Sequence, residues 1–265
     1  MDLAHGASSY HIGLDDAHGA RYAILPGDPG RVESIAALLE RPRFLCQNRE
    51  YTSWIGELLG EPVLVTSTGI GGPSAAICVE ELYMAGVRNF IRVGTCGGMA
   101  PEVAAGDIVI ANAAIRMDGV TREYVPVEFP AVADISVTNA LIAASQERGA
   151  AWHCGVVHCK DSFYGQHSPE RMPAGYELCE KWRAWIAAGC LASEMESSSV
   201  FIVSQILQAR AGCVLSAIWN QELRHPEPGA SYRPDTEAAV KIAVDAVRIL
   251  IQDDHTNTPR TGGAR

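Results

Sequence analysis

The chain has 265 residues, of which 48% are hydrophobic and 20% are charged, and its formal net charge is −10. This length suits one large α/β domain or two small ones, and the acidic balance argues against non-specific nucleic-acid binding. No apolar run approaches the ~20 residues of a membrane-spanning helix, and the first residues lack the apolar core of a signal peptide. The eight cysteines are scattered without a Cys-x-x-Cys pair, which predicts reduced thiols in a cytoplasmic protein.

The N-terminal part of the chain contains a first arrangement suited to an anion. Residues 21–26 form an apolar run typical of a buried strand. Asp28 fits an N-cap and Pro29 the first position of a helix, which we expect to continue to about Glu40. A strand, a glycine turn, a helix N-terminus and Arg31 together predict an anion site, because the helix N-terminus presents free N–H groups. The alternative is a capped loop without a ligand.

The central part of the chain contains a second such arrangement. Paired strands, a buried strand, a helix and another buried strand are predicted at residues 44–47 and 51–58, 62–67, 74–85 and 89–95. Arg92 interrupts the last strand, and a buried Arg is costly unless an opposite charge meets it. The glycines around Thr95 offer backbone N–H groups to an anion at the end of this strand. Alternatively, Arg92 pairs with an internal carboxylate and the glycines make a tight turn; this motif alone leaves both interpretations open.

The C-terminal half alternates further strands and helices. We expect strands at residues 107–111, 153–160 and 211–219, a short segment at 190–195, and helices at 136–148, 176–188, 196–210 and 236–252. Residues 114–133 are predicted to be loop-rich and residues 161–175 irregular. The order strand–helix–strand predicts right-handed crossovers and a mainly parallel sheet. Residues 1–252 then form one domain, followed by a disordered tail at 253–265.

Two His–Cys pairs fall within one of these predicted strands. His153 with Cys154 and His158 with Cys159 have the residue types of a metal cluster. The alternating pattern of residues 153–160 favours a strand over a metal site.

Five motifs, taken in order, resemble those of a known family. They are Gly27-Asp28-Pro29-x-Arg31, Arg49-Glu50, Ser67-Thr-Gly-Ile-Gly-Gly-Pro-Ser74, Arg92-Val-Gly-Thr95 and Glu194-Met-Glu196. Over roughly residues 9–252 the chain resembles the nucleoside phosphorylase-I family. The resemblance implies a single-domain, three-layer α/β/α sandwich around a mixed, partly barrel-like sheet. It also implies a pentosyltransferase that cleaves uridine with phosphate to uracil and ribose 1-phosphate in pyrimidine salvage, as a homo-oligomer, commonly a hexamer built as a trimer of dimers.

The resemblance also assigns the phosphate and ribose sites. It places phosphate at Gly27, Arg31, Arg92 and Thr95, with Arg49 and His11 arriving from a neighbouring subunit, His11 towards the ribose. Arginine suits this role because its planar guanidinium forms bidentate hydrogen bonds with phosphate. The ribose would lie at Glu194, Met195 and Glu196, where the Glu196 carboxylate accepts from sugar hydroxyls and opposes the positive charge that develops on the sugar. The alternative for these acids is an acid-rich helix N-terminus.

For the base, the resemblance implies a stacking ring, a bidentate amide and an apolar wall, at Phe163, Gln166 and Ile218. Arg92, Gln166 and Glu196 are thus the expected catalytic residues. The chain departs from the family pattern at Ser168, where an arginine is expected two residues after the glutamine. Lys160 and His167 are the nearby cations that could replace it, and Arg171 is a third candidate farther along the loop.

A monovalent cation and inorganic phosphate are the expected small partners. Glu50, Ile70 and Ser74 match positions that bind such a cation, K⁺, at a dimer interface in the family. A carboxylate, a backbone carbonyl and a hydroxyl are hard oxygen ligands that suit this ion. Glu50 as the partner of Arg49 is an equally good interpretation. No other cofactor is required, and phosphate is a co-substrate.

Three alternative functions remain at this point. A purine nucleoside phosphorylase shares the fold and the phosphate site, but purine-acting relatives place an Asp where this chain has Asn220, which cannot deliver a proton. A nucleoside hydrolase has no use for three phosphate-directed arginines. A catalytically silent nucleoside-binding homologue predicts broken phosphate or ribose motifs, and these motifs are intact.

Overall fold

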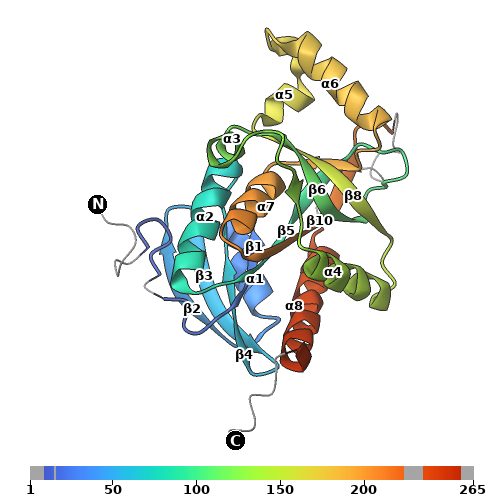
Figure 1. Cartoon of the computed structure of the whole chain (residues 1–265). Coiled ribbons are helices and arrows are strands. Elements are labelled where there is room, and N and C mark those ends of the chain that lie inside the picture. Colours follow the sequence, from blue (N-terminus) through green and yellow to red (C-terminus); the bar gives the residue numbers. More distant parts are fainter. Residues whose placement is uncertain (1–8, 15, 224–234, 258–265) are drawn as a thin grey trace, which may run out of the picture.

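Strands buried on both faces build the centre of the protein. The computed structural model describes residues 9–14, 16–223 and 235–257 (Figure 1). Its strands are β1 (Tyr22–Pro26), β2 (Glu40–Asn48), β3 (Tyr51–Leu58), β4 (Glu61–Thr66), β5 (Asn89–Gly98), β6 (Ile108–Met117), β7 (Ala131–Val132), β8 (Trp152–Lys160), β9 (Ala192–Glu194) and β10 (Arg210–Asn220). In β1, Ala23 and Leu25 enter one hydrophobic core, and Tyr22 and Ile24 enter the other. This double burial explains the unbroken apolar run in the sequence.

Part of the sheet closes into a ring. Strand β5 pairs with β10, β10 with β6, β6 with β8, β8 with β9, and β9 with β5 again. Outside the ring β1 lies between β5 and β4, β3 and β2 extend the sheet, and β7 pairs with β6. The mixed, partly barrel-like sheet implied by the family resemblance is therefore confirmed. The expectation of a mainly parallel sheet is wrong for the β2–β3–β4 strands, because short turns join them and such connections force antiparallel pairing.

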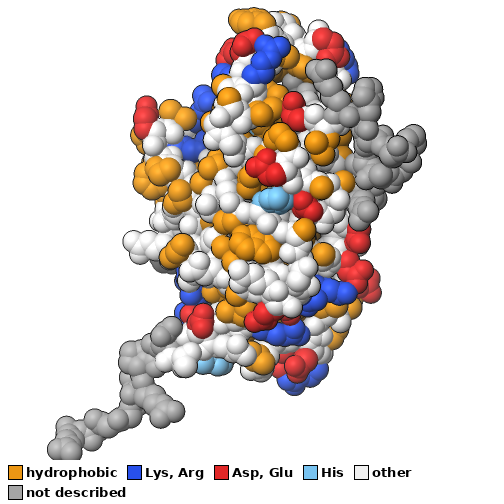
Figure 2. Space-filling model, turned by 90° about the vertical axis from the view of Figure 1, so that its right-hand side faces the viewer, with side chains coloured by type: hydrophobic (Ala, Val, Ile, Leu, Met, Phe, Trp, Pro, Cys, Tyr) orange, Lys and Arg blue, Asp and Glu red, His pale blue; other side chains and the backbone are white. Residues whose placement is uncertain are grey.

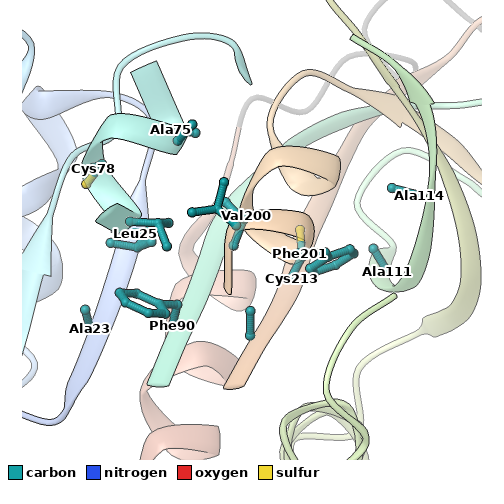
Figure 3. Packing of buried hydrophobic residues seen from close by; sticks show 14 of the residues in the cluster. Ala23, Leu25, Ala75, Cys78, Phe90, Ala111, Ala114, Val200, Phe201 and Cys213 are labelled. Atoms are coloured by element: carbon teal, nitrogen blue, oxygen red, sulfur yellow. The ribbon is translucent and has the colours of Figure 1, made fainter. Parts of the chain in front are cut away.

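Helices cover both faces of the sheet, which makes a three-layer α/β/α domain. They are α1 (Val32–Ala36), α2 (Gly72–Ala85), α3 (Val120–Tyr124), α4 (Ile135–Glu147), α5 (Phe163–His167), α6 (Gly175–Ala187), α7 (Ser197–Ile206) and α8 (Glu237–Asn257), with 3₁₀ turns at Pro29–Arg31 and Pro169–Arg171. Figure 3 shows Ala75 of α2 and Val200 of α7 in one core, on the side of the sheet from which Leu25 and Phe90 project. Helices α4 and α8 pack in the other core, which contains Leu141 and Val247.

Several predicted boundaries are corrected by the structure. The helix after Asp28 ends at Ala36 rather than near Glu40, because β2 begins at Glu40. The helix predicted at residues 196–210 ends at Ile206, since β10 begins at Arg210. The segment predicted to be irregular at 161–175 contains α5 and a 3₁₀ turn. Helix ends are set by the tertiary packing of the next element, which a periodic pattern does not report.

Arg116 organises the segment at 114–133 that was predicted to be loop-rich. Strand β6 continues through this arginine to Met117, and α3 and β7 follow. The buried guanidinium donates to four backbone carbonyls at 2.6–2.8 Å, those of Thr121, Val125, Pro126 and Phe129. One side chain thus satisfies four carbonyls of this connection, which otherwise would need water or a sheet partner.

The C-terminal helix α8 extends beyond its predicted end. It continues to Asn257, so the predicted tail is wrong for residues 253–257, while residues 258–265 lie outside the described residues. Asp254 in this last turn accepts a hydrogen bond of 2.6 Å from the hydroxyl of Tyr22 and pairs with Arg210. These contacts with β1 and β10 keep the helix end ordered. Within the described ranges, every helix is too short or too polar to span a membrane.

Candidate active site

A cavity of about 600 Å³ lies beside the last residues of β1, β5, β8, β9 and β10. The motifs of the sequence analysis line it from several strands, at Gly27, Arg31, Arg92, Thr95, Glu194, Met195, Glu196, Lys160, Phe163, Gln166, His167 and Ile218. Residues far apart in the chain therefore meet in one place, as expected for a ligand site at strand ends.

Arg92 is a buried charge that lines this cavity. It is 3% exposed, its Nε donates to Glu194 Oε2 at 3.0 Å, and its Nη2 pairs with Glu196 Oε2. The internal carboxylates foreseen by the alternative interpretation are therefore present, and they belong to the expected ribose motif. The buried Nη1 of Arg92 has no hydrogen-bond partner among the residues that the structure describes. A buried donor of this kind costs free energy unless a ligand or water accepts from it.

Gly94 provides the room for this guanidinium. A Cβ atom at Gly94 would lie 2.9 Å from Arg92 Nη2, which is closer than real side chains approach. The glycine after the Arg92-Val93 step is thus required by the packing of the arginine itself. The tight-turn interpretation is wrong at this position, because β5 continues as a strand to Gly98.

The two carboxylates that flank Arg92 have different surroundings. Burial opposes ionisation of Glu194, but the Arg92 charge and hydrogen bonds from Ser197 and the Glu196 amide lower its pKa. For Glu196, burial is the larger effect and raises the pKa, although Arg92 acts in the opposite direction. Both oxygens of Glu194 are engaged by these protein donors, while Glu196 Oε1 accepts from the Gly71 amide at 2.6 Å. Glu194 therefore supports Arg92 and the start of α7.

Arg31 brings a second guanidinium to the same cavity. Asp28 caps the 3₁₀ turn by accepting from the Gly30 amide at 2.8 Å, which confirms the predicted N-cap and places Arg31 at the cavity wall. Burial lowers the pKa of Arg31, Asp28 opposes this shift, and the nearby positive charge of Arg92 adds to it. Two guanidinium groups that repel each other at one cavity are a site where an anion would be stabilised.

Aromatic rings also line the cavity. The ring of His167 lies 4.3 Å from that of Phe163 and 5.4 Å from that of Trp219, measured between centroids. Burial and the charge of Lys160 lower the pKa of His167, which favours its neutral form. Trp219 fits because Gly97 has no side chain, since a Cβ there would lie 3.2 Å from the indole Nε1. A flat ligand can stack on this wall.

Lys160 and Gln166 belong to a hydrogen-bonded chain at one end of the cavity. Lys160 Nζ donates to Ser193 Oγ at 2.8 Å, and Ser193 Oγ donates to Gln166 Oε1 at 2.8 Å. Gln166 Nε2 donates to Gln221 Oε1 at 3.0 Å. Ser193 and Gln221 were missed by the sequence reasoning. Their positions, one residue before Glu194 and one after Asn220, were the available signal.

Four of the discussed residues lie elsewhere in this chain. His11 is held on Glu81, with 2.6 Å between Nδ1 and Oε1, and exposed Arg49 occupies the β2–β3 turn with a φ of 54°. Ser168 ends α5, and the exposed guanidinium of Arg171 lies 6.0 Å from the Tyr164 ring. These four are not among the described residues that line the cavity.

The expected cation ligands are partly brought together. Ser74 Oγ lies 2.8 Å from Glu50 Oε1, and a backbone hydrogen bond together with this hydroxyl lowers the pKa of Glu50. Gly69 has a φ of 69°, and a Cβ there would lie 2.6 Å from Glu50 Cγ, so the glycine permits this approach. Ile70 lines the cavity edge and its side chain is 78% exposed.

The burial of His158, which lies beside Ser193, predicts that the stability of the fold depends on pH. Burial against Trp185, together with the charge of Lys160, lowers the pKa of His158 to about 3. Below about pH 6.5 the unfolded chain binds a proton here that the folded protein does not, so acidification towards pH 3 destabilises the fold. This site alone should contribute a slope approaching 1.4 kcal/mol per pH unit.

We expect the free energy of unfolding of His158→Gln to depend less on pH between pH 4 and 6 than that of the wild type. The slope should fall by nearly the contribution of one proton, about 1.4 kcal/mol per pH unit. Urea unfolding at several pH values measures this slope. His255→Gln is the matched control, because His255 is exposed at the end of α8 and pairs only with Glu61 across 3.1 Å in the described structure. An unchanged slope in His158→Gln would contradict the argument.

The fold is an α/β domain whose cavity at the strand ends brings two guanidinium groups and several aromatic rings together. The chain belongs to the phosphorylase superfamily, whose family model matches residues 21–252. It is 51% identical over 245 residues to a protein named uridine phosphorylase from Treponema pallidum, covering 92% of this chain and 95% of that one. The Escherichia coli uridine phosphorylase is 43% identical, covering 91% and 98%. A guanosine phosphorylase from Halorubrum lacusprofundi is 33% identical, covering 92% and 100%.

Proposed function

We propose that this chain is a uridine phosphorylase, which transfers the ribosyl group of uridine to inorganic phosphate and releases uracil. The single observation that carries the proposal is Arg92, buried between Glu194 and Glu196 with a donor nitrogen left over. Such a group can bind an anion on one side and fix a sugar-binding carboxylate on the other. The relatives that bear this name and match nearly the whole chain support the same reading.

The chemistry follows from charge. A phosphate oxygen attacks C1′ of the ribose, the glycosidic C–N bond breaks, and its electron pair leaves with the uracil. We assign phosphate to Gly27, Arg31, Arg92 and Thr95, which lie together at the cavity. Glu196 accepts from the ribose hydroxyls and stabilises positive charge on the sugar, while Met195 lies against the sugar. We assign Glu194 a positioning role because its two oxygens accept from Arg92, the Glu196 amide, and the amide and hydroxyl of Ser197. Among the described residues, Glu196 has fewer protein donors, Arg92 and the Gly71 amide, so its oxygens retain lone pairs for the sugar hydroxyls.

We place the uracil at the aromatic end of the cavity. Phe163 and His167 offer ring faces, Ile218 an apolar wall, and Gln166 a paired donor and acceptor for the imide edge. A departing uracil carries negative charge on its carbonyl oxygens, so a nearby cation accelerates its release. Lys160 is the cation that lines the same end of the cavity, and it stands in our proposal for the arginine missing at Ser168. The exposed position of Arg171 makes it the weaker candidate.

Asn220 favours a pyrimidine over a purine. Its Nδ2 donates to the carbonyls of Ala100 and Val103, both at 2.8 Å, and its Oδ1 accepts from the Glu222 amide. The side chain is therefore occupied in bracing the backbone, and an amide cannot protonate a purine N7 in any case. Asn220 therefore does not supply the general acid that cleavage of a purine nucleoside would require at this position.

A substrate panel tests the proposal directly. We expect phosphate-dependent cleavage of uridine to ribose 1-phosphate, and a kcat/KM for inosine and guanosine at least tenfold lower. Product analysis of uridine, deoxyuridine, inosine and guanosine, each with and without phosphate, measures this. Equal turnover without phosphate would point to a hydrolase, and guanosine cleaved as well as uridine would point to a purine enzyme like the guanosine phosphorylase relative.

We further propose that the active unit is a homo-oligomer, a hexamer built as a trimer of dimers, working in cytoplasmic pyrimidine salvage. Arg49 and His11 would then reach the cavity of a neighbouring subunit. Large apolar side chains support contacts between subunits: Ile70 at the cavity edge is 78% exposed and Phe44 on β2 is 52% exposed. Figure 2 also shows hydrophobic side chains exposed between charged ones on the face it displays.

A monovalent cation, K⁺, is the one ion that we propose at the subunit boundary. The adjacent oxygens of Glu50 and Ser74 and the backbone carbonyl of Ile70 would hold it, and such hard oxygen donors suit the ion. Its charge would help to order the β2–β3 turn, which carries Arg49, and the β4–α2 connection, which carries Gly69.

A further inference from the structure

Gln166 lies between two neighbouring cavities and lines both of them. A second cavity, of about 380 Å³, lies beside α6 and is lined by Trp182, Trp185 and Leu178 among others. Lys160 and Gln166 line both this cavity and the larger one. The side chain of Gln166 therefore has open space on either side, and packing alone does not hold its amide in one orientation.

Hydrogen bonds hold it instead. Burial lowers the pKa of Lys160, and the nearby carboxylates of Glu194 and Glu196 oppose this shift. In its ammonium form the lysine can only donate hydrogen bonds. Ser193 Oγ must therefore accept from Lys160, which leaves its own hydrogen for Gln166 Oε1 at 2.8 Å. Ser193 is 3% exposed and Lys160 is 7% exposed, so water does not easily replace either bond.

The far end of the amide is fixed as well. Gln166 Nε2 donates to Gln221 Oε1 at 3.0 Å, which follows once Oε1 is turned towards Ser193. The neutral imidazole of His158 lies with Nδ1 3.0 Å from Ser193 Oγ. This arrangement requires the tautomer that carries its hydrogen on Nδ1, because this imidazole then donates to Ser193 Oγ and leaves the serine hydrogen for Gln166. One hydrogen of Nε2 and one lone pair of Oε1 remain, in a fixed order, for a ligand.

We propose that Lys160, Ser193 and Gln221 form an orientation lock on Gln166, and that this lock selects a base with an imide edge and rejects an aminopyrimidine. The inference rests on the proposed function. An imide presents a carbonyl acceptor next to an N–H donor, which a fixed amide matches in one order. Cytosine presents an amino donor next to a ring-nitrogen acceptor, so it needs the amide turned over. A free Gln166 could turn and accept both, whereas a locked one leaves unpaired polar groups against cytosine.

The test compares kcat/KM for uridine and cytidine at saturating phosphate. We expect Ser193→Ala and Lys160→Met each to raise KM for uridine about tenfold and to lower the uridine-to-cytidine preference at least tenfold, with KM for phosphate unchanged. Gln221→Leu, which removes the other end of the lock, should lower the preference in the same direction. Ser193→Thr keeps the hydroxyl and should restore most of the preference, which a merely structural defect would not allow.

Matched controls come from the same chain. Ser204→Ala removes a buried hydroxyl on α7 that has no partner in the described structure, and Lys181→Met removes an exposed lysine of α6. Both should keep the wild-type preference. The lock is overturned if Ser193→Ala and Gln221→Leu keep the uridine-to-cytidine preference, whether their activities are unchanged or fall in equal proportion for both substrates. A wild-type enzyme that cleaves no uridine with phosphate overturns the proposed function itself, a result distinct from an active enzyme with an unaltered preference.

Discussion

Replacing Arg92 by methionine should lower kcat/KM for uridine by a hundredfold or more. Its guanidinium lies between Glu194 and Glu196, and its Nη1 has no hydrogen-bond partner in the part of the chain that the structure describes. In our proposal Arg92 therefore contacts the phosphate while it holds the carboxylate that faces the sugar. Losing one preorganised charge contact of this kind typically costs ~2.7–4 kcal/mol of transition-state stabilisation. Steady-state kinetics with varied uridine and varied phosphate measure the loss, which should include weaker phosphate binding.

The same substitution leaves two buried carboxylates without their partner, so stability must be measured beside activity. Breaking a buried ion pair typically costs about 3–5 kcal/mol. Arg31→Met is the matched variant, because Arg31 lines the cavity and its one ion pair among the described residues is a loose 3.9 Å contact with Asp28. It should lose phosphate affinity with little loss of stability. Arg148→Met, which removes a surface pair with Asp245, is the neutral control. Native kinetics in a folded Arg92→Met would contradict the assigned site.

Mixed oligomers of two inactive variants should recover activity. Arg49 lies in the β2–β3 turn, away from the cavity of its own chain, whereas Glu196 lies inside that cavity. If Arg49 serves a neighbour, a mixed dimer of Arg49→Ala and Glu196→Gln contains one intact site out of two. Each pure variant should retain below about 1% of wild-type activity, on the scale of a lost charge contact.

The measurement needs verified subunit exchange. Differently tagged variants are mixed, the mixed species is isolated by both tags, and uridine cleavage is assayed with phosphate. A mixture of Glu196→Gln with Arg92→Ala is the control, because both residues lie in the same cavity and no intact site can form. Mixed Arg49→Ala and Glu196→Gln oligomers without recovered activity would show that Arg49 does not act across subunits.

The sequence was most informative at local patterns that only a few structures can explain. The double-faced apolar run of β1, the N-cap at Asp28 and the lone arginine in β5 each predicted a feature that the structure contains. The family resemblance supplied the ring-like sheet, which no local pattern indicates. The ring depends on the pairing of β5 with β10, whose registered residues are Asn89 and Arg210 at the start of the contact. Such pairings are set by tertiary packing rather than by periodicity.

The remaining features depended on long-range polar contacts. Arg116 orders its connection through backbone carbonyls, and these leave no mark in the side-chain pattern. Ser193 and Gln221 are ordinary polar residues in sequence, and only their contacts with Gln166 give them a role. Glu194 lines the cavity as the ribose prediction requires, and the sequence did not indicate that its oxygens also accept from Arg92 and the start of α7.

Closure of the strand ring has a consequence for how this chain folds. The pair that closes it joins residues 121 positions apart, since Arg210 Nε bonds to the Asn89 side chain. Contacts between such distant segments form slowly, because the entropy of closing the intervening loop is lost before the contact is gained. Strand β10 also supplies Ile218 and Trp219 to the cavity. A chain still emerging from the ribosome therefore has no complete catalytic pocket until its last strand has joined the first half.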